Sequence, residues 1–282
     1  MISKSVEESL SAGVEKNLRD MIQRGGNILI AQNRVTADLQ TQTATPITSN
    51  IFDILDDFGL IMAENLVLDK NCGQVTISQN RGFFRMNSQV EYPFFPLVQN
   101  FTDHVTVKGL EQLRTLFTSE IIADTLSSDY TVLPLFYTSD QSTTVEQFFN
   151  LNPVENPAFT TLNQSGKLIA ALSMTTTDSL GTASQMILVS DSRFLADDGG
   201  GRIPENTIFV MNAIDYLMGD SDLVELRSRE ITTRPLKVIE DSARARWKWI
   251  NILLPSALVI AFGIFRWKSE SKRSRMLEEM YE

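Results

Sequence analysis

The sequence predicts an α/β protein whose body is built on a parallel sheet, carries an irregular β insertion and is followed by one transmembrane helix. Two observations indicate the sheet. A helical pattern over residues 7–24 leads through two glycines into an apolar run at 27–31, and apolar runs of strand length also occupy 167–173 and 185–191. A third observation, the uncharged stretch at 250–265, indicates the membrane helix.

The first predicted helix is amphipathic and ends at Gly25-Gly26, a pair that favours a left-handed carboxyl-terminal cap. The side chains predicted to face inward are Leu10, Val14, Leu18, Met21 and Ile22. Only residues 1–4 precede this helix–glycine–strand unit, and a doubly wound domain rarely begins so abruptly. We therefore expect that an amino-terminal portion of the body is missing from this sequence.

Less regular elements are predicted after the first strand. Residues 35–50 are rich in Thr and Gln and predict a polar loop. Residues 50–58 predict a helix that is capped by Asn50 and ended by Gly59. Residues 65–69 predict the next strand of the sheet.

The β insertion is predicted over residues 72–101, where the pattern is strand-like but interrupted. Pro93 and Pro96 should block both a regular helix and a central strand in this stretch. Further along the chain, residues 131–137 predict a strand and residues 206–218 an amphipathic helix.

The stretch at 250–265 has the features of a single membrane anchor. Trp247, Trp249 and Trp267 bracket it, and the 21 residues from the first to the last of them span about 31 Å as a helix. A buried core helix is the alternative, because the uncharged run itself is shorter than about 20 residues. The anchor is favoured by the flanking tryptophans and by basic residues just outside the uncharged stretch, namely Arg244, Arg246, Lys248, Arg266, Lys268, Lys272, Arg273 and Arg275.

This pattern divides the chain into a body at 1–235, a juxtamembrane segment at 236–246, a transmembrane helix at 247–267 and a mixed basic and acidic tail at 268–282. The net charge of −10 is spread unevenly. Residues 244–282 hold 8 Lys and Arg against 4 Asp and Glu, whereas the rest of the chain holds 17 against 31. An acidic body of this kind argues against a nucleic-acid partner. The basic residues of 244–282 are then the ones expected to contact membrane lipid.

The inventory of reactive side chains predicts no catalytic, cofactor-binding or metal-binding residue, so the protein is not expected to be an enzyme. Cys72 is the only cysteine and His104 the only histidine, and both are expected in turns or loops. Residues 69–73 are similar to the start of a calcium loop, but Gln74 and Asn80 stand where that motif needs glycine and glutamate. A turn after a strand is the favoured interpretation.

One position invites a ligand hypothesis. Asp191 and Ser192 follow the strand predicted at 186–189, and residues at the carboxyl ends of parallel strands often line binding crevices. Asp191 could equally cap the following turn, and the cap is the favoured interpretation. The alternative is a ligand-binding module that takes a sugar or a peptide at this crevice.

Several stretches taken together resemble the GldG family, the auxiliary component of a gliding-motility ABC transporter, and its uncharacterised relatives. The resemblance covers nearly the whole chain, and it rests on the order of its motifs and on the terminal anchor. The motifs are residues 18–30, 57–60 with 65–69, 92–97, 189–194, 212–217, and 226–231 with 234–236.

The resemblance implies an α/β body similar to a flavodoxin-like or degenerate amidotransferase sheet, held outside the bacterial inner membrane between two membrane helices. It implies a periplasmic body, a cytoplasmic tail, and ABC permease and ATPase subunits as partners. Trp247, Trp249, Asn251, Pro255 and Trp267 then mark the anchor and the face that would dock on the permease.

Basic residues flank both ends of the anchor, so charge alone leaves the orientation open. Homo-oligomerisation is left open as well. An anchored hydrolase is the least favoured alternative, because it would need a pair of carboxylates facing one cleft.

Overall fold

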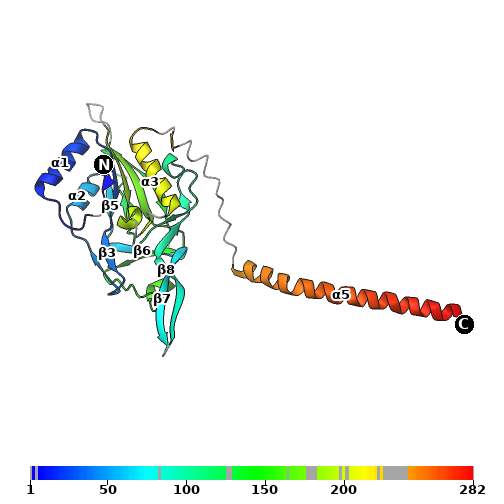
Figure 1. The fold of residues 1–282 in the computed structure, drawn as a ribbon. Helices are drawn as coiled ribbons and strands as arrows, with labels where there is room; N and C mark the ends of the chain where they lie inside the picture. Colours follow the sequence, from blue (N-terminus) through cyan, green and yellow to red (C-terminus); the bar gives the residue numbers. More distant parts are fainter. Residues whose placement is uncertain are drawn as a thin grey trace. The chain divides into compact units, whose positions relative to one another are not determined.

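The computed structural model falls into two compact units, Met1–Thr233 and Arg234–Glu282, each of which is described by itself (Figure 1). The structure describes residues 2–3, 6–81, 84–124, 129–163, 165–175, 183–196, 199–200, 203–220, 223–224 and 241–281. Residues 226–231 and 234–236, which carry part of the predicted resemblance, lie outside these ranges. So do residues 236–240 of the predicted juxtamembrane segment.

The body is organised on one mixed sheet of six strands. Across the sheet, the strands follow the order β1 (Ile2–Ser3), β2 (Ile28–Ala31), β15 (Gln185–Val189), β14 (Leu168–Thr175), β12 (Tyr130–Tyr137) and β9 (Asn100–Phe101). The pairs β1–β2 and β2–β15 are parallel, whereas β15–β14, β14–β12 and β12–β9 are antiparallel. The apolar runs at 27–31, 167–173 and 185–191 are confirmed as neighbouring strands of this sheet.

The predicted parallel sheet of flavodoxin or amidotransferase type is wrong. Among the strands that the structure describes, only the two pairs that involve β2 are parallel, and each of the smaller sheets is antiparallel. The connection from β14 to β15 covers only residues 176–184, and a parallel crossover needs about a dozen residues or more. Such a short connection returns the chain antiparallel to the strand it has just left.

Alternating side chains give the central sheet two buried faces. Ile28 and Ile30 of β2 face a cluster that includes α1 (Ala12–Gln23) and α2 (Ile51–Asp56). Leu29 points to the opposite face, where α3 (Pro204–Leu217) contributes Phe209 and Ala213. Figure 1 shows α1 and α2 on one side of the strands and α3 on the other. The body is therefore a helix–sheet–helix arrangement despite its mixed strand directions.

Helix α1 is shorter and less completely packed than predicted. It begins at Ala12, so Leu10 lies before it, and Val14 is 52% exposed. Leu18 and Ile22 are buried as expected, and Gly25 adopts a positive φ of 82° after the helix. The inward face of α1 is thus only half used in core packing.

Asn50 stands immediately before α2, as predicted, but its side chain makes no cap hydrogen bond. Its Oδ1 accepts the Leu10 N–H at 2.7 Å, and its Nδ2 donates to the Leu10 carbonyl at 3.1 Å. Asn50 therefore holds the segment that leads into α1. Gly59 ends this region with a φ of 69°, and a Cβ there would lie 2.0 Å from the Tyr130 ring.

The other described strands of the body form four small antiparallel sheets. They are β10–β8–β7, β13–β6, β11–β5 and β3–β4. Their bounds are β3 Val35–Asp38, β4 Thr43–Pro46, β5 Leu60–Met62, β6 Asn65–Asp69, β7 Cys72–Arg81, β8 Phe84–Val98, β10 Leu113–Arg114, β11 Ile121–Ala123 and β13 Ser142–Glu146. Short 3-10 helices among the described residues include η1 Val105–Val107, η2 Pro157–Thr160 and η3 Ser192–Leu195.

These sheets correct two predictions. Residues 35–50, predicted to be a polar loop, contain the hairpin β3–β4. Strand β8 runs through Pro93 and Pro96, which were expected to block a central strand, and it lies in the middle of the sheet β10–β8–β7. The register between β7 and β8 shifts between the pairs Gln74–Glu91 and Cys72–Pro96, so Pro93 falls in the irregular part of the ladder. A residue without an N–H is tolerated there because no ladder bond needs it.

The second unit contains α5 (Asp241–Tyr281), a helix of 41 residues with Pro255 inside it. The helix extends beyond the predicted span of 247–267 at both ends. The stretch predicted to be a separate tail is helical up to Tyr281.

Candidate functional site

Asp191 follows β15 and is fully buried. Its Oδ1 accepts the Arg193 N–H at 2.8 Å, so the predicted capping role is confirmed at the start of η3. Its Oδ2 accepts the Leu116 N–H at 2.8 Å, which ties this turn to a segment far away in sequence. Burial raises the pKa of Asp191 to about 7, although the backbone donors act in the opposite direction.

The surroundings of Asp191 are filled by protein groups. The Ser192 N–H donates to Asn33 Oδ1. The hydroxyls of Ser190 and Thr118 hydrogen-bond to each other, and the Ser190 hydroxyl also donates to the Ile169 carbonyl at 3.1 Å. The crevice role of Asp191 and Ser192 stays a prediction, and the carboxylate of Asp191 offers no exposed surface to a ligand.

Cys72 and His104, the cysteine and the histidine of the chain, lie in separate parts of the body, and neither environment activates its side chain. Burial raises the pKa of the Cys72 thiol to about 11, and the nearby Glu91 carboxylate adds to this. Burial lowers the pKa of His104, whose Nδ1 lies 2.9 Å from the Thr106 hydroxyl and whose ring packs on Tyr216 at 4.9 Å between centroids. Neither environment activates a nucleophile or a base.

The stretch that is similar to a calcium loop is a turn after strand β6, as predicted. The carboxylate of Asp69 accepts the N–H groups of Ser139 at 2.6 Å and of Asn71 at 2.8 Å, together with the Ser139 hydroxyl. Asp69 is fully buried, so these bonds fix the turn. In the part of the chain that the structure describes, no group of three or more His, Cys, Asp or Glu side chains could hold a metal ion.

Helix α5 contains one segment, Ala245–Lys268, that is long and apolar enough to cross a membrane, with a mean hydropathy of 1.8. The predicted flanking residues Trp247, Trp249 and Trp267 stand near its ends and are 61%, 61% and 70% exposed. Asn251 and Pro255 lie inside the segment. Their predicted role in docking on a partner helix stays a prediction.

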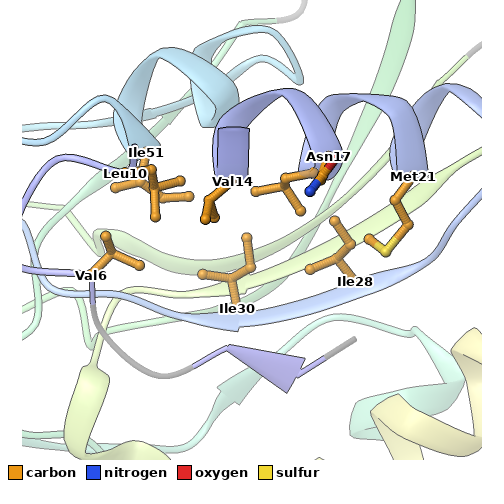
Figure 2. Close-up of a pocket in the computed structure, with 9 residues that line it drawn as sticks. Val6, Leu10, Val14, Asn17, Met21, Ile28, Ile30 and Ile51 are labelled. Atoms are coloured by element: carbon orange, nitrogen blue, oxygen red, sulfur yellow. The ribbon is translucent and has the colours of Figure 1, made fainter. Parts of the chain in front are cut away.

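A cavity between α1 and β2 is a feature that sequence reasoning missed. Its volume is about 280 Å³, and Figure 2 shows apolar side chains converging on it from the helix, the strand and the preceding segment. It is lined by Val6, Leu10, Val14, Asn17, Leu18, Met21, Ile28, Ile30 and Ile51. The sequence signal was the apolar face of the predicted helix, which includes Leu10, Val14, Leu18 and Met21, and that face was assigned to core packing.

The fold and the apolar helix together define a class: a mixed α/β body whose chain continues into one candidate membrane-spanning segment. Residues 5–213 match the family described as "ABC-type uncharacterized transport system". The chain belongs to this family. The predicted resemblance is thereby confirmed at the level of an ABC-type transport system, whereas the gliding-motility component remains a finer prediction.

An uncharacterised protein of Borreliella burgdorferi (strain ATCC 35210 / DSM 4680 / CIP 102532 / B31) is 24% identical over 296 aligned positions. The alignment covers 96% of this chain and 55% of the relative, so the chain spans about half the length of that protein. Among solved structures, the mmIFT52 N-terminal domain is 14% identical over 77% of this chain and 75% of its own. Its TM-score of 0.46 is too low to establish a common fold.

Proposed function

We propose that this protein is a non-catalytic, membrane-anchored auxiliary subunit of an ABC-type transport complex. The observation that carries the proposal is the family match over residues 5–213, followed in the same chain by the apolar segment Ala245–Lys268. A body joined to one membrane helix suits a subunit that binds to a transporter and leaves transport and ATP hydrolysis to the other subunits.

The proposal of a non-catalytic role rests on the state of the reactive side chains. The Cys72 thiol has a raised pKa and so carries little thiolate at neutral pH. His104 is engaged with Thr106 and Tyr216. The pKa of Asp191 is raised by burial, and each of its two carboxylate oxygens accepts a backbone N–H. These contacts support structural roles for all three residues.

We assign the partners and the orientation from the resemblance to the gliding-motility family. The body would lie on the periplasmic side of the inner membrane, the end of α5 in the cytoplasm, and a permease and an ATPase would complete the complex. The same resemblance makes surface gliding the cellular process to test, by deleting the gene and following motility.

Co-purification tests the partnership. The tagged full chain, extracted in mild detergent from its native membrane, should recover a permease and an ATPase. Asn251→Leu and Pro255→Leu should stay in the membrane but recover at least several-fold less permease, because they remove the groups predicted to pack against a partner helix. Ile252→Leu is the matched apolar control. A monodisperse wild-type chain without either partner would refute the proposal.

Accessibility to a membrane-impermeant thiol reagent tests the orientation. Cys72 is a poor reporter because burial raises its pKa, so the experiment starts from Cys72→Ser. Gln40→Cys places a thiol on the exposed turn between β3 and β4, and Ser274→Cys places one near the end of α5. In intact spheroplasts the first should react and the second should be protected. The reverse pattern would place the body in the cytoplasm.

A further inference from the structure

The cavity beneath α1 is built almost entirely from hydrocarbon. Eight of its nine lining residues are apolar, and Asn17 supplies the one polar side chain. Ile28 and Ile30 of β2 are almost completely buried and form its wall on the sheet, whereas Val14 of α1 is 52% exposed at its mouth. The cavity therefore has a fixed wall on the sheet and an opening along α1.

A second, polar hollow adjoins the apolar cavity at the end of α1. Its volume is about 460 Å³, and it shares Asn17 and Met21 with the apolar cavity. Its other lining residues are Asp20, Arg24, Gly25 and Gly26. The apolar cavity and the polar hollow thus meet at Asn17 and Met21, and the lining of the hollow includes an amide, a carboxylate and a guanidinium.

Water fits this arrangement poorly on the apolar side. A buried water needs two to four polar partners, and the apolar part offers only the amide of Asn17. An engineered apolar cavity of about 150 Å³ remains dry and binds benzene. A cavity of about 280 Å³ with similar walls is suited to a larger hydrocarbon guest.

We propose that this paired site binds a single-chain amphiphile, with its alkyl tail between α1 and β2 and its head group in the polar hollow. A methylene group occupies about the volume of a water molecule, which is about 30 Å³. A cavity of about 280 Å³ therefore has room for an alkyl chain of about nine methylenes. The Arg24 guanidinium would contact an anionic part of the head group. The inference rests on the body alone and does not depend on the proposed transport partnership.

Photolabelling of the full chain in its own membranes tests the site. The probe is a decanoate with a diazirine near its methyl end, and labelled residues are identified by mass spectrometry. Label is expected at the end of the cavity away from the polar hollow, on Leu10, Val14, Ile30 or Ile51, and an excess of decylphosphocholine should remove it. Label confined to α5 would overturn the proposal, because it would report only general partition into an apolar segment.

Matched variants sharpen the test. Val14→Trp fills the mouth and should lower labelling of the body at least tenfold, whereas Ile122→Trp, at a position exposed to a similar extent, should leave it unchanged. Leu10→Trp blocks the other end of the cavity, and it replaces Val14→Trp in the test if Val14→Trp lowers the melting temperature.

Arg24→Gln tests the contact with the head group and should weaken labelling by the anionic probe several-fold. Labelling that is insensitive to both blocking tryptophans would overturn the assignment of the tail.

Discussion

At the scale of single residues, Asp191 joins three parts of the body through one carboxyl group. It lies two residues after the end of β15. Its carboxyl group caps η3 by accepting the Arg193 N–H, and it also accepts the Leu116 N–H from the segment that follows β10. The neighbouring Asn206 side chain extends this connection, because it accepts from the Arg114 N–H at 3.0 Å and donates to the Arg114 carbonyl at 2.8 Å. A buried group with two backbone donors is costly to replace.

Asp191→Asn should destabilise the body by about 1–3 kcal/mol, because an amide can accept one N–H but turns its own donors toward the other. The effect should depend on pH. Burial raises the folded-state pKa from 3.8 to about 7, so the stabilisation by Asp191 is complete below pH 4 and is lost as the pH rises through 7. The deficit of the variant should therefore be larger at pH 5 than at pH 8.

Urea unfolding at both pH values, followed by circular dichroism, measures this difference. Asn206→Ala, which interrupts the neighbouring connection without removing a titrating group, is the control and should show nearly the same deficit at both pH values. If the deficit of Asp191→Asn were equal or larger at pH 8, the carboxylate would be ionised in the folded protein at both values.

At the scale of elements, α5 differs from the helices of the body because its apolar segment, residues 250–265, has no buried stripe. Its apolar residues from 250 to 265 are all exposed, although such residues are normally covered in a folded protein. In α1, by contrast, Leu18 and Ile22 are buried against the sheet. A contiguous apolar surface of this length is expected to be covered by lipid or by partner helices.

Arginines in the middle of α5 should release the chain from membranes. Leu254→Arg with Leu258→Arg introduces two charges, each costing about 3 kcal/mol at the centre of a spanning helix. Vesicle flotation and alkaline extraction should then find most of the double variant in the soluble fraction. Ser274→Arg adds a charge to the same helix beyond the apolar segment and should leave flotation unchanged. Equal flotation of all three proteins would exclude α5 as the anchor.

At the scale of the whole molecule, the two units have different sources of stability. The described residues of the unit Met1–Thr233 form three clusters of buried apolar side chains, two on the faces of the central sheet and one among the small sheets. In the third cluster the buried Tyr92 donates to the Leu151 carbonyl at 2.8 Å. The unit Arg234–Glu282 is described as one helix.

Truncation after Thr233 should therefore leave a folded body. We expect the melting temperature, followed by far-ultraviolet circular dichroism, to stay within a few degrees of the body transition in the full chain, because no cluster of the core is lost. The truncated protein should also be absent from the membrane fraction. A broad or missing transition would show that the body needs the second unit in order to fold.

The candidate sites differ in how far sequence could predict them. The candidate membrane span could be predicted from sequence, because Trp247, Trp267 and the apolar residues between them form one continuous stretch of the chain. Asp191 was recognised as a cap for the same reason, since a cap forms within two or three residues. The cavity beneath α1 was not predictable, because it depends on how far Val14 stands from Ile30 across the fold.

The sequence by itself determined the local features: the apolar segment Ala245–Lys268, the strands β2, β14 and β15, and the chain reversal at Gly25. Each follows from length, hydrophobicity or backbone freedom over a few neighbouring residues. The tertiary structure decided the direction of the strands, the passage of β8 through two prolines, and the space left between α1 and the sheet. These depend on contacts between residues far apart in the chain, where pairing and packing override local preference.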